Sequence, residues 1–132
     1  MADRHIIVID AGSSRARCFV LDQNADVVSS RSAEWRHAQV DDASPYAREF
    51  DPDWLWRTMC GLLSDALGDA KVPPRSIAAV TATSQRQGVV FLDGDGREVY
   101  AGPNLDLRAV FEGGAIDEEM RDRVYATTGH TP

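Results

Sequence analysis

The sequence predicts an α/β fold in which a mixed sheet, opened by an antiparallel three-strand meander, is covered by flanking helices. Short apolar runs without a helical period fill the first 35 residues. An apolar stripe at helical spacing follows from residue 52 to residue 70, and another short apolar run comes after it. Strands, then a crossover helix, then a further strand are typical of a mixed sheet with helical cover.

The first three predicted strands are joined by short turns, which makes neighbouring strands antiparallel. The β-branched run 5–10 predicts a buried strand. The run 16–22 alternates, with Cys18 and Val20 on one face. The third run, 27–35, follows a Gln-Asn-Ala-Asp segment, which is typical turn chemistry.

The main helix is predicted over 52–70. Residues 36–50 before it show no period and are expected to form a surface loop. Asp51 is suited to be the N-cap of the helix, and Pro52 suits its first position. Two consecutive prolines, at 73–74, end the helical pattern.

The remaining chain alternates between short strands and loops before a last helix. The predicted segments are a strand at 77–83, a polar loop at 84–88, hairpin strands at 89–92 and 97–100, an irregular stretch or short strand at 103–108, and, after the Gly113-Gly114 pair, a helix at about 116–125.

Length and composition limit the classes of function. The 132 residues suit one domain, and 14 basic against 21 acidic side chains give a net charge of −7, which argues against nucleic-acid binding. No apolar stretch is long enough to span a membrane, and the N-terminus lacks signal-peptide character, so a cytoplasmic protein is expected. Cys18 and Cys60 both fall in apolar patterns and are predicted to be buried free thiols.

The first candidate site is the turn after the first strand. Asp10 ends a buried strand, and Gly12 permits close approach of a ligand to the backbone. Ser13 and Ser14 offer hydroxyls, and Arg17 offers a positive charge, so the segment can bind phosphate oxygens. The Asp10 carboxylate can hold hydrated Mg²⁺. A plain hairpin with a capping aspartate explains the same residue types and remains the alternative.

The second candidate site is the polar loop at 84–88, after a predicted strand. Gln85, Arg86 and Gln87 can hydrogen-bond the hydroxyls of a polar substrate. A solvated connecting loop is the alternative. Further along, Asp106 and Arg108 are predicted to form an ion pair that shapes the loop at 103–108.

Taken in order, these segments resemble the N-terminal region of the FGGY carbohydrate kinases. The matching features are the Asp-x-Gly-Thr-x-x-x-Arg turn at 10–17 (with Ser13 for Thr), an acidic-Pro helix start at 50–56, a Gln-rich substrate loop at 84–88, a Trp-x-Asp-x-Arg segment at 104–108 (with Asn104 for Trp) and a Thr-Gly pair at 128–129. The Asn-x-Asp-x-Arg form of the fourth feature is similar to the autoinducer-2 kinase branch.

The resemblance implies a ribonuclease H-like fold of the actin, Hsp70 and hexokinase class. It also implies transfer of the γ-phosphoryl group of ATP to a hydroxyl of a sugar or polyol, with Mg²⁺. Asp10 would then be catalytic and organise the metal, while the residues facing the nucleotide phosphates would be Gly12, Ser13, Ser14 and Arg17. The residues contacting the substrate would be Gln85, Arg86, Gln87, Asn104 and Asp106.

The resemblance also implies that residues 1–132 are the N-terminal part of kinase domain I. Family members are roughly three to four times longer than this chain, which is beyond a single typical domain, so the catalytic base and second domain are expected beyond Pro132. This chain alone is then expected to be inactive, and a homodimer of the intact enzyme is compatible with the family. Two other interpretations stay open: a stand-alone actin-like half-domain that acts as a non-catalytic interaction module, and an acetate-kinase-like or glucokinase-like branch of the same superfamily.

Overall fold

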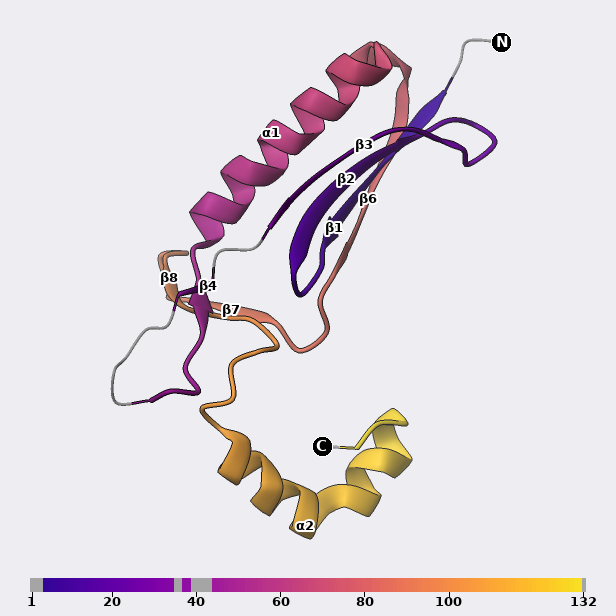
Figure 1. The fold of residues 1–132 in the computed structure, drawn as a ribbon. Helices are drawn as coiled ribbons and strands as arrows, with labels where there is room; N and C mark the ends of the chain where they lie inside the picture. Colours follow the sequence, from indigo (N-terminus) through magenta and orange to yellow (C-terminus); the bar gives the residue numbers. More distant parts are fainter. Residues whose placement is uncertain (1–3, 35–36, 39–43, 132) are drawn as a thin grey trace.

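A four-stranded mixed sheet forms the centre of the molecule (Figure 1). The structure is a computed structural model that describes residues 4–34, 37–38 and 44–131. The sheet contains β1 (His5–Ala11), β2 (Arg15–Leu21), β3 (Val27–Glu34) and β6 (Ile77–Ser84), in the order β3-β2-β1-β6. β1 and β2, and β2 and β3, pair antiparallel, whereas β6 runs parallel to β1. The predicted meander and its neighbouring strand are therefore confirmed.

Helix α1 (Pro52–Ala70) covers one face of this sheet, over β2 and β3. Asp51 is the N-cap, because its carboxylate accepts a hydrogen bond from the backbone N–H of Trp54 at 2.8 Å. The helix ends at Lys71, whose left-handed backbone lets its N–H reach carbonyls of the last turn. Both predicted ends of this helix are confirmed.

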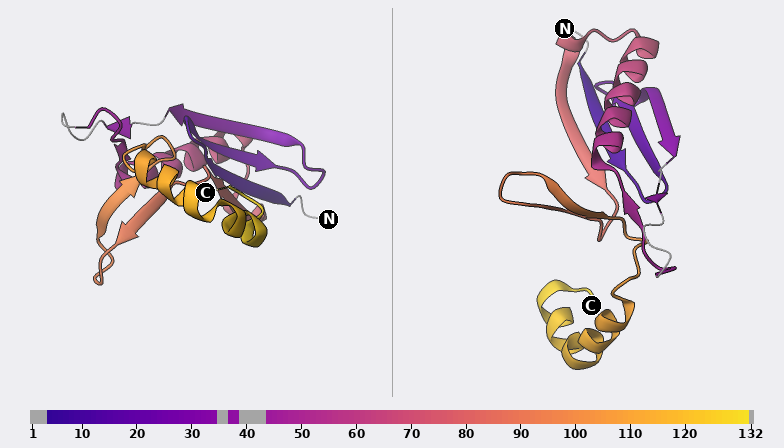
Figure 2. Two further views of the ribbon diagram at one scale, coloured as in Figure 1. Left: turned by 90° about the horizontal axis from the view of Figure 1, so that it is seen from below. Right: turned by 90° about the vertical axis from the view of Figure 1, so that its left-hand side faces the viewer.

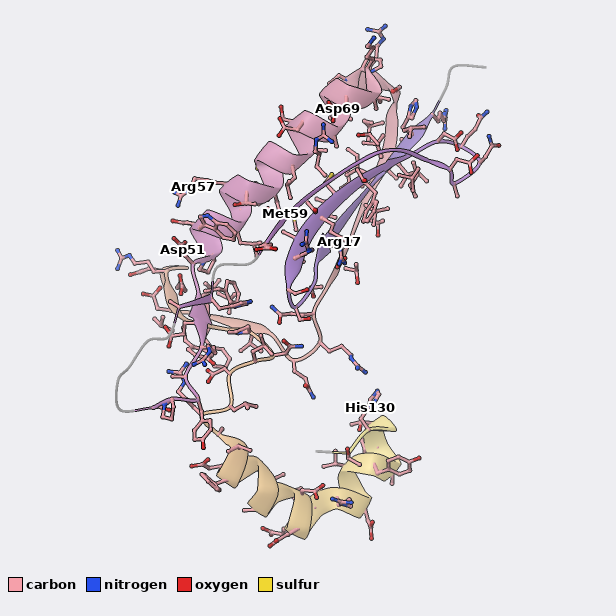
Figure 3. All side chains as sticks on the ribbon, in the orientation of Figure 1. Arg17, Asp51, Arg57, Met59, Asp69 and His130 are labelled. Carbon is pink, nitrogen blue, oxygen red and sulfur yellow. The ribbon has the colours of Figure 1, made fainter. Side chains whose placement is uncertain are left out.

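The core lies between α1 and the sheet. Figure 3 shows Met59 on the side of the helix that faces the strands. The buried members of this cluster are Ile7, Ala16, Cys18, Val20, Met59, Leu62, Ala66 and Val72. Outside the cluster, Arg31 of β3 pairs with Asp69 of α1, which joins the edge of the sheet to the end of the helix.

The two cysteines behave differently. Cys18 is fully buried as predicted, and burial raises the pKa of its thiol. The prediction for Cys60 is wrong, because this residue is exposed. Its neighbours Met59 and Leu62 occupy the buried stripe of α1, so a residue one position after Met59 points away from the sheet.

Two short ribbons lie beyond one end of the sheet. β4 (His37–Ala38) pairs with β5 (Glu49–Phe50), and β7 (Val89–Leu92) pairs with β8 (Glu98–Gly102). The prediction of a plain loop at 36–50 is therefore wrong at its two ends, since each pairs for two residues, too few to leave a sequence pattern. Trp35 and Arg36, which fall at the end of the third predicted strand and the start of that loop, lie outside the described residues, as do residues 39–43.

Helix α2 (Val110–Thr128) lies apart from the sheet, as Figure 1 and the right-hand view of Figure 2 show. It is longer than predicted at both ends and includes the Gly113-Gly114 pair that was expected to precede it. None of its residues is buried. Gly129 ends it in a left-handed conformation that suits glycine. No helix of the described chain, including the short 3-10 helix Pro74–Ser76 before β6, is long and apolar enough to cross a membrane.

Candidate active site

The parallel pairing of β1 and β6 brings the two predicted sites together. Asp10 lies opposite Thr83, and Ala11 lies opposite Ser84, at the carboxyl ends of both strands. The backbone N–H of Gln85 donates to the carbonyl of Ala11 at 2.8 Å. Segments more than 70 residues apart in the sequence therefore meet at one edge of the sheet, which is where α/β folds place their ligands.

The turn after β1 is shaped by a cross-strand ion pair. Antiparallel register sets Arg17 opposite Asp10, and Nη1 of Arg17 lies 2.9 Å from Oδ2 of Asp10. A Cβ added to Gly12 would lie 3.2 Å from a backbone oxygen of the turn and 3.6 Å from the Asp10 carboxylate, so glycine keeps the backbone close to this carboxylate. Ser13 and Ser14 are exposed at the tip of the turn.

The turn fits magnesium only together with phosphate groups. Among the described residues, no group of three His, Cys, Asp or Glu side chains could hold a metal ion. Mg²⁺ usually binds one or two carboxylates plus substrate phosphates and waters. Asp10 fits that pattern, because its side chain is only 21% exposed and its Oδ1 accepts no hydrogen bond within the described chain.

The second loop leaves two polar side chains free. Arg86 is exposed and forms no ion pair or hydrogen bond with any described residue. Gln87 is also exposed and has a left-handed backbone with φ of 63°. Gln85 differs from both, because its Oε1 accepts a hydrogen bond from the backbone N–H of Asn104 at 3.0 Å.

Asp106 belongs to a network that joins the loop at 103–108 to two strands. Nη2 of Arg108 lies 2.7 Å from Asp106 and 2.9 Å from the Glu49 carboxylate of β5. The Tyr100 hydroxyl of β8 donates to Asp106, and the Arg108 guanidinium lies 5.0 Å from the centre of the Tyr100 ring. The predicted ion pair of Asp106 and Arg108 is confirmed.

The network changes the acidity of its members. Burial favours a higher pKa for Asp106, but hydrogen bonds from Arg108 and Tyr100 outweigh burial and lower that pKa to about 2. Burial, and then the Asp106 carboxylate, raise the pKa of Tyr100. A Cβ at Gly102 would overlap the Tyr100 hydroxyl, so the network also requires glycine there. Sequence reasoning missed Tyr100 and Glu49, because no motif marks either residue.

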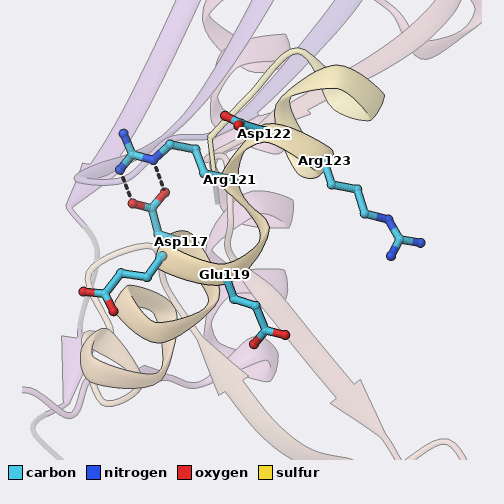
Figure 4. A pocket seen from close by; sticks show the side chains of 6 residues that line it. Asp117, Glu119, Arg121, Asp122 and Arg123 are labelled. Atoms are coloured by element: carbon cyan, nitrogen blue, oxygen red, sulfur yellow. Dashed lines mark hydrogen bonds and ion pairs between the residues drawn. The ribbon is translucent and has the colours of Figure 1, made fainter.

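Of two hollows on the surface, one lies at the sheet edge where β1 and β6 end, and the other lies on α2. The first has a volume of about 180 Å³ and is lined by Ala11, Phe50, Leu55, Ser84, Gln85, Gly88, Val89 and Val90. The second is larger, at about 540 Å³, and is lined only by charged residues of α2, two of which, Asp117 and Arg121, form an ion pair (Figure 4). Because one exposed helix supplies every wall of the larger hollow, it is a surface groove and no part of the candidate site.

Comparison with known proteins identifies sequence relatives over nearly the whole chain. Residues 5–131 match the N-terminal domain of the FGGY family of carbohydrate kinases. An autoinducer-2 kinase of Escherichia coli strain SMS-3-5 is 34% identical over 131 residues, covering 96% of this chain and 24% of that protein. An autoinducer-2 kinase of Salmonella paratyphi B is 33% identical over the same length. The chain therefore spans about a quarter of the length of these relatives.

Solved structures show the same fold. A gluconate kinase from Lactobacillus acidophilus superposes with a TM-score of 0.80 at 20% identity, covering 95% of this chain and 25% of that one. A xyloylose kinase from Brucella ovis gives a TM-score of 0.82 at 18% identity, covering 97% and 26%. The predicted ribonuclease H-like fold, present here as part of a domain, is confirmed.

Proposed function

Because the chain belongs to the FGGY family of carbohydrate kinases, we propose that it is the N-terminal part of kinase domain I of an ATP-dependent kinase. The enzyme transfers the γ-phosphoryl group of ATP to a hydroxyl of a sugar or polyol, in the cytoplasm. The observation that carries this proposal is the meeting of the turn after β1 with the loop after β6 at one edge of the sheet. Phosphoryl transfer depends mainly on positioning and charge neutralisation, and two adjacent polar loops suit that task.

The turn after β1 serves the phosphate side of the reaction. Gly12 keeps the backbone near the Asp10 carboxylate, and the hydroxyls of Ser13 and Ser14 at the tip are exposed for phosphate oxygens. Asp10 holds hydrated Mg²⁺, which supplies charge neutralisation when bound. Arg17, on the neighbouring strand β2, forms an ion pair with the Asp10 carboxylate and so fixes its position.

The loops at 84–88 and 103–108 serve the acceptor side. Arg86 and Gln87 have no partner in the described chain and offer donors and an acceptor to hydroxyl groups. Asn104 adds a carboxamide oxygen that is buried and unpartnered among the described residues. Asp106 shapes this side through its network with Arg108 and Tyr100. The relatives from Escherichia coli and Salmonella are autoinducer-2 kinases, so autoinducer-2 is the first acceptor to test.

A chimera tests the proposal. In it, this chain replaces the matching quarter of the Escherichia coli autoinducer-2 kinase, and ATP-dependent phosphorylation of autoinducer-2 is measured. We expect turnover, and we expect Asp10→Ala to lower kcat by at least about a hundredfold, because metal and phosphate charge are stabilised chiefly in the transition state.

The control is Asp26→Ala, which removes an exposed carboxylate from the turn between β2 and β3. This variant should keep the turnover of the unmodified chimera. Acceptor affinity, measured by calorimetry, should stay within a few-fold in Asp10→Ala. A cooperatively folded chimera without turnover, or an Asp10→Ala chimera with normal turnover, would contradict the proposed function.

A further inference from the structure

The side chain of Gln85 points to a role different from that of its two neighbours in the loop. We propose that Gln85 is a positioning residue that holds the backbone of Asn104, so that the Asn104 carboxamide meets a hydroxyl of the phosphoryl acceptor. This inference rests on the proposed kinase function for the identity of the ligand. It assigns Gln85 a contact within the chain, whereas the family resemblance had grouped it with residues that contact the substrate.

Gln85 connects three segments that are distant in the sequence. Its backbone N–H donates to Ala11 at the end of β1, at 2.8 Å. Its side-chain Oε1 accepts from the backbone N–H of Asn104, at 3.0 Å and 19 residues away. Both contacts are partly shielded from water, since Gln85 and Asn104 are each half-buried. One residue therefore ties the phosphate side of the edge to the loop at 103–108.

Gly88 leaves the space that this arrangement needs. A Cβ added to Gly88 would lie 3.0 Å from Cγ, 3.1 Å from Cδ and 3.2 Å from Nε2 of Gln85. These distances are tighter than ordinary contacts, so a larger residue at position 88 would require the Gln85 side chain, which holds the Asn104 N–H, to shift by a few tenths of an ångström. The same two residues, Gln85 and Gly88, line the hollow of about 180 Å³ beside the edge.

The side-chain oxygen of Asn104 is an acceptor that receives no hydrogen bond from the described residues. This atom, Oδ1, is also buried. Leaving a buried acceptor without a donor is unfavourable, so the arrangement is best satisfied by a donor from outside the described chain. A substrate hydroxyl is such a donor, and the bond to Gln85 fixes the backbone from which the Asn104 carboxamide extends.

Amide hydrogen exchange of this chain tests whether Gln85 holds Asn104. We expect Gln85→Leu to speed exchange of the Asn104 amide, relative to that of Ile7 in the core, by roughly two- to tenfold. Gln85→Glu keeps an acceptor oxygen and should leave the ratio unchanged. Gln23→Leu, the same substitution in the exposed turn after β2, is the control and should also leave it unchanged.

Gly88→Ala provides a second, independent variant. Its methyl group should speed Asn104 exchange in the unmodified chain, but not in a Gln85→Ala background, where there is no side chain to displace. Unchanged Asn104 exchange in Gln85→Leu, or an equal effect of Gly88→Ala in both backgrounds, would overturn the assignment.

Kinetics of the chimera test what Asn104 is positioned for. Gln85→Leu should raise the acceptor KM by roughly two- to tenfold, with kcat and the KM for ATP little changed, and Gln85→Glu should restore it. Faster Asn104 exchange with an unchanged acceptor KM in an active chimera would overturn the proposed role. A chimera without turnover would instead contradict the kinase function, while the exchange rates would still decide whether Gln85 holds Asn104.

Discussion

At Asp106, three interactions act on one carboxylate whose side chain is only 7% exposed. Tyr100 donates its hydroxyl, and Arg108 donates from both its side chain and its backbone. The guanidinium also reaches Glu49, so the network joins the loop at 103–108 to β5 and β8. Because Glu49 and Arg108 are 59 residues apart in the sequence, their contact forms only when β5 and the loop before α2 fold together.

This network predicts a specific loss of stability in acid. The folded pKa of Asp106 is about 2 against 3.8 for the free side chain, so its contribution is complete above about pH 4 and is lost as the pH falls toward 2. The contribution is at most about 2 kcal/mol. Urea unfolding of this chain should show that Asp106→Asn is less stable at pH 7 and that its stability falls less between pH 4 and pH 2.

The control for Asp106 is Asp95→Asn in the turn between β7 and β8. Asp95 is 74% exposed and, within the part of the chain that the structure describes, pairs only with Arg97, at 3.5 Å, so its loss should leave the acid profile unchanged. If Asp106→Asn and the unmodified chain lost stability in parallel below pH 4, the network would not hold the carboxylate as described.

Single residues also show what the sequence could and could not predict. Two strands and a short turn were sufficient to predict that Asp10 and Arg17 belong to one site, but their ion pair was not predicted, because Arg17 was expected to face phosphate. The roles of Gln85 and Tyr100 depend on contacts with Asn104 and Asp106, which lie on a separate loop. No spacing rule relates Gln85 to Asn104, because the path of the intervening β7–β8 hairpin determines their distance. Tyr100 lies in β8, six residues before Asp106, and no motif marks that pair.

Among the elements, α1 was predicted with its correct ends because several independent signals agree. Asp51 caps it, Pro52 suits its first position, and its apolar period matches the buried stripe. The pairing of β4 with β5 was missed because two residues are too few to show a period of two. The start of α2 was misplaced because Gly113 and Gly114, which weaken helices, lie inside its first turns.

Helix α2 should be the least protected element of the isolated chain. It buries no residue, and its N-cap Ala109 makes no side-chain capping bond, so only local interactions stabilise it. We expect amide exchange in α2 to be at least about a hundredfold faster than at Met59 and Leu62 of α1.

A matched pair of glycine substitutions checks the cause of this difference. Gly114→Ala in α2 and Gly61→Ala in α1 both place a methyl group in open space. Each adds about 1 kcal/mol of helix propensity, so Gly114→Ala should slow exchange in α2 about fivefold without altering α1. Exchange in α2 as slow as in α1 would show that α2 is held by contacts that the structure lacks.

Over the whole molecule, large apolar side chains are left exposed on several elements. Val80 on the edge strand β6, Phe91 and Val99 on the β7–β8 hairpin, and Phe111 and Tyr125 on α2 are each more than half exposed. The chain spans about a quarter of the length of its curated relatives. Apolar side chains exposed on several elements suit packing against other protein. The non-catalytic interaction module predicts the same exposed surface, so exposure does not separate the two interpretations.

The kinase and the non-catalytic interaction module can be distinguished by whether the sheet edge has a phosphate side and an acceptor side. Steady-state kinetics of the chimera, with ATP and acceptor both varied, measures this division directly for Arg86→Ala. We expect the acceptor KM to rise by roughly five- to 150-fold, because unpaired hydroxyls at a partly desolvated site cost about 1–3 kcal/mol, while the KM for ATP changes little. Arg75→Ala, which removes another exposed arginine at the opposite end of β6, should leave both constants unchanged. A raised KM for ATP with an unchanged acceptor KM would place the loop after β6 on the nucleotide side and contradict the account.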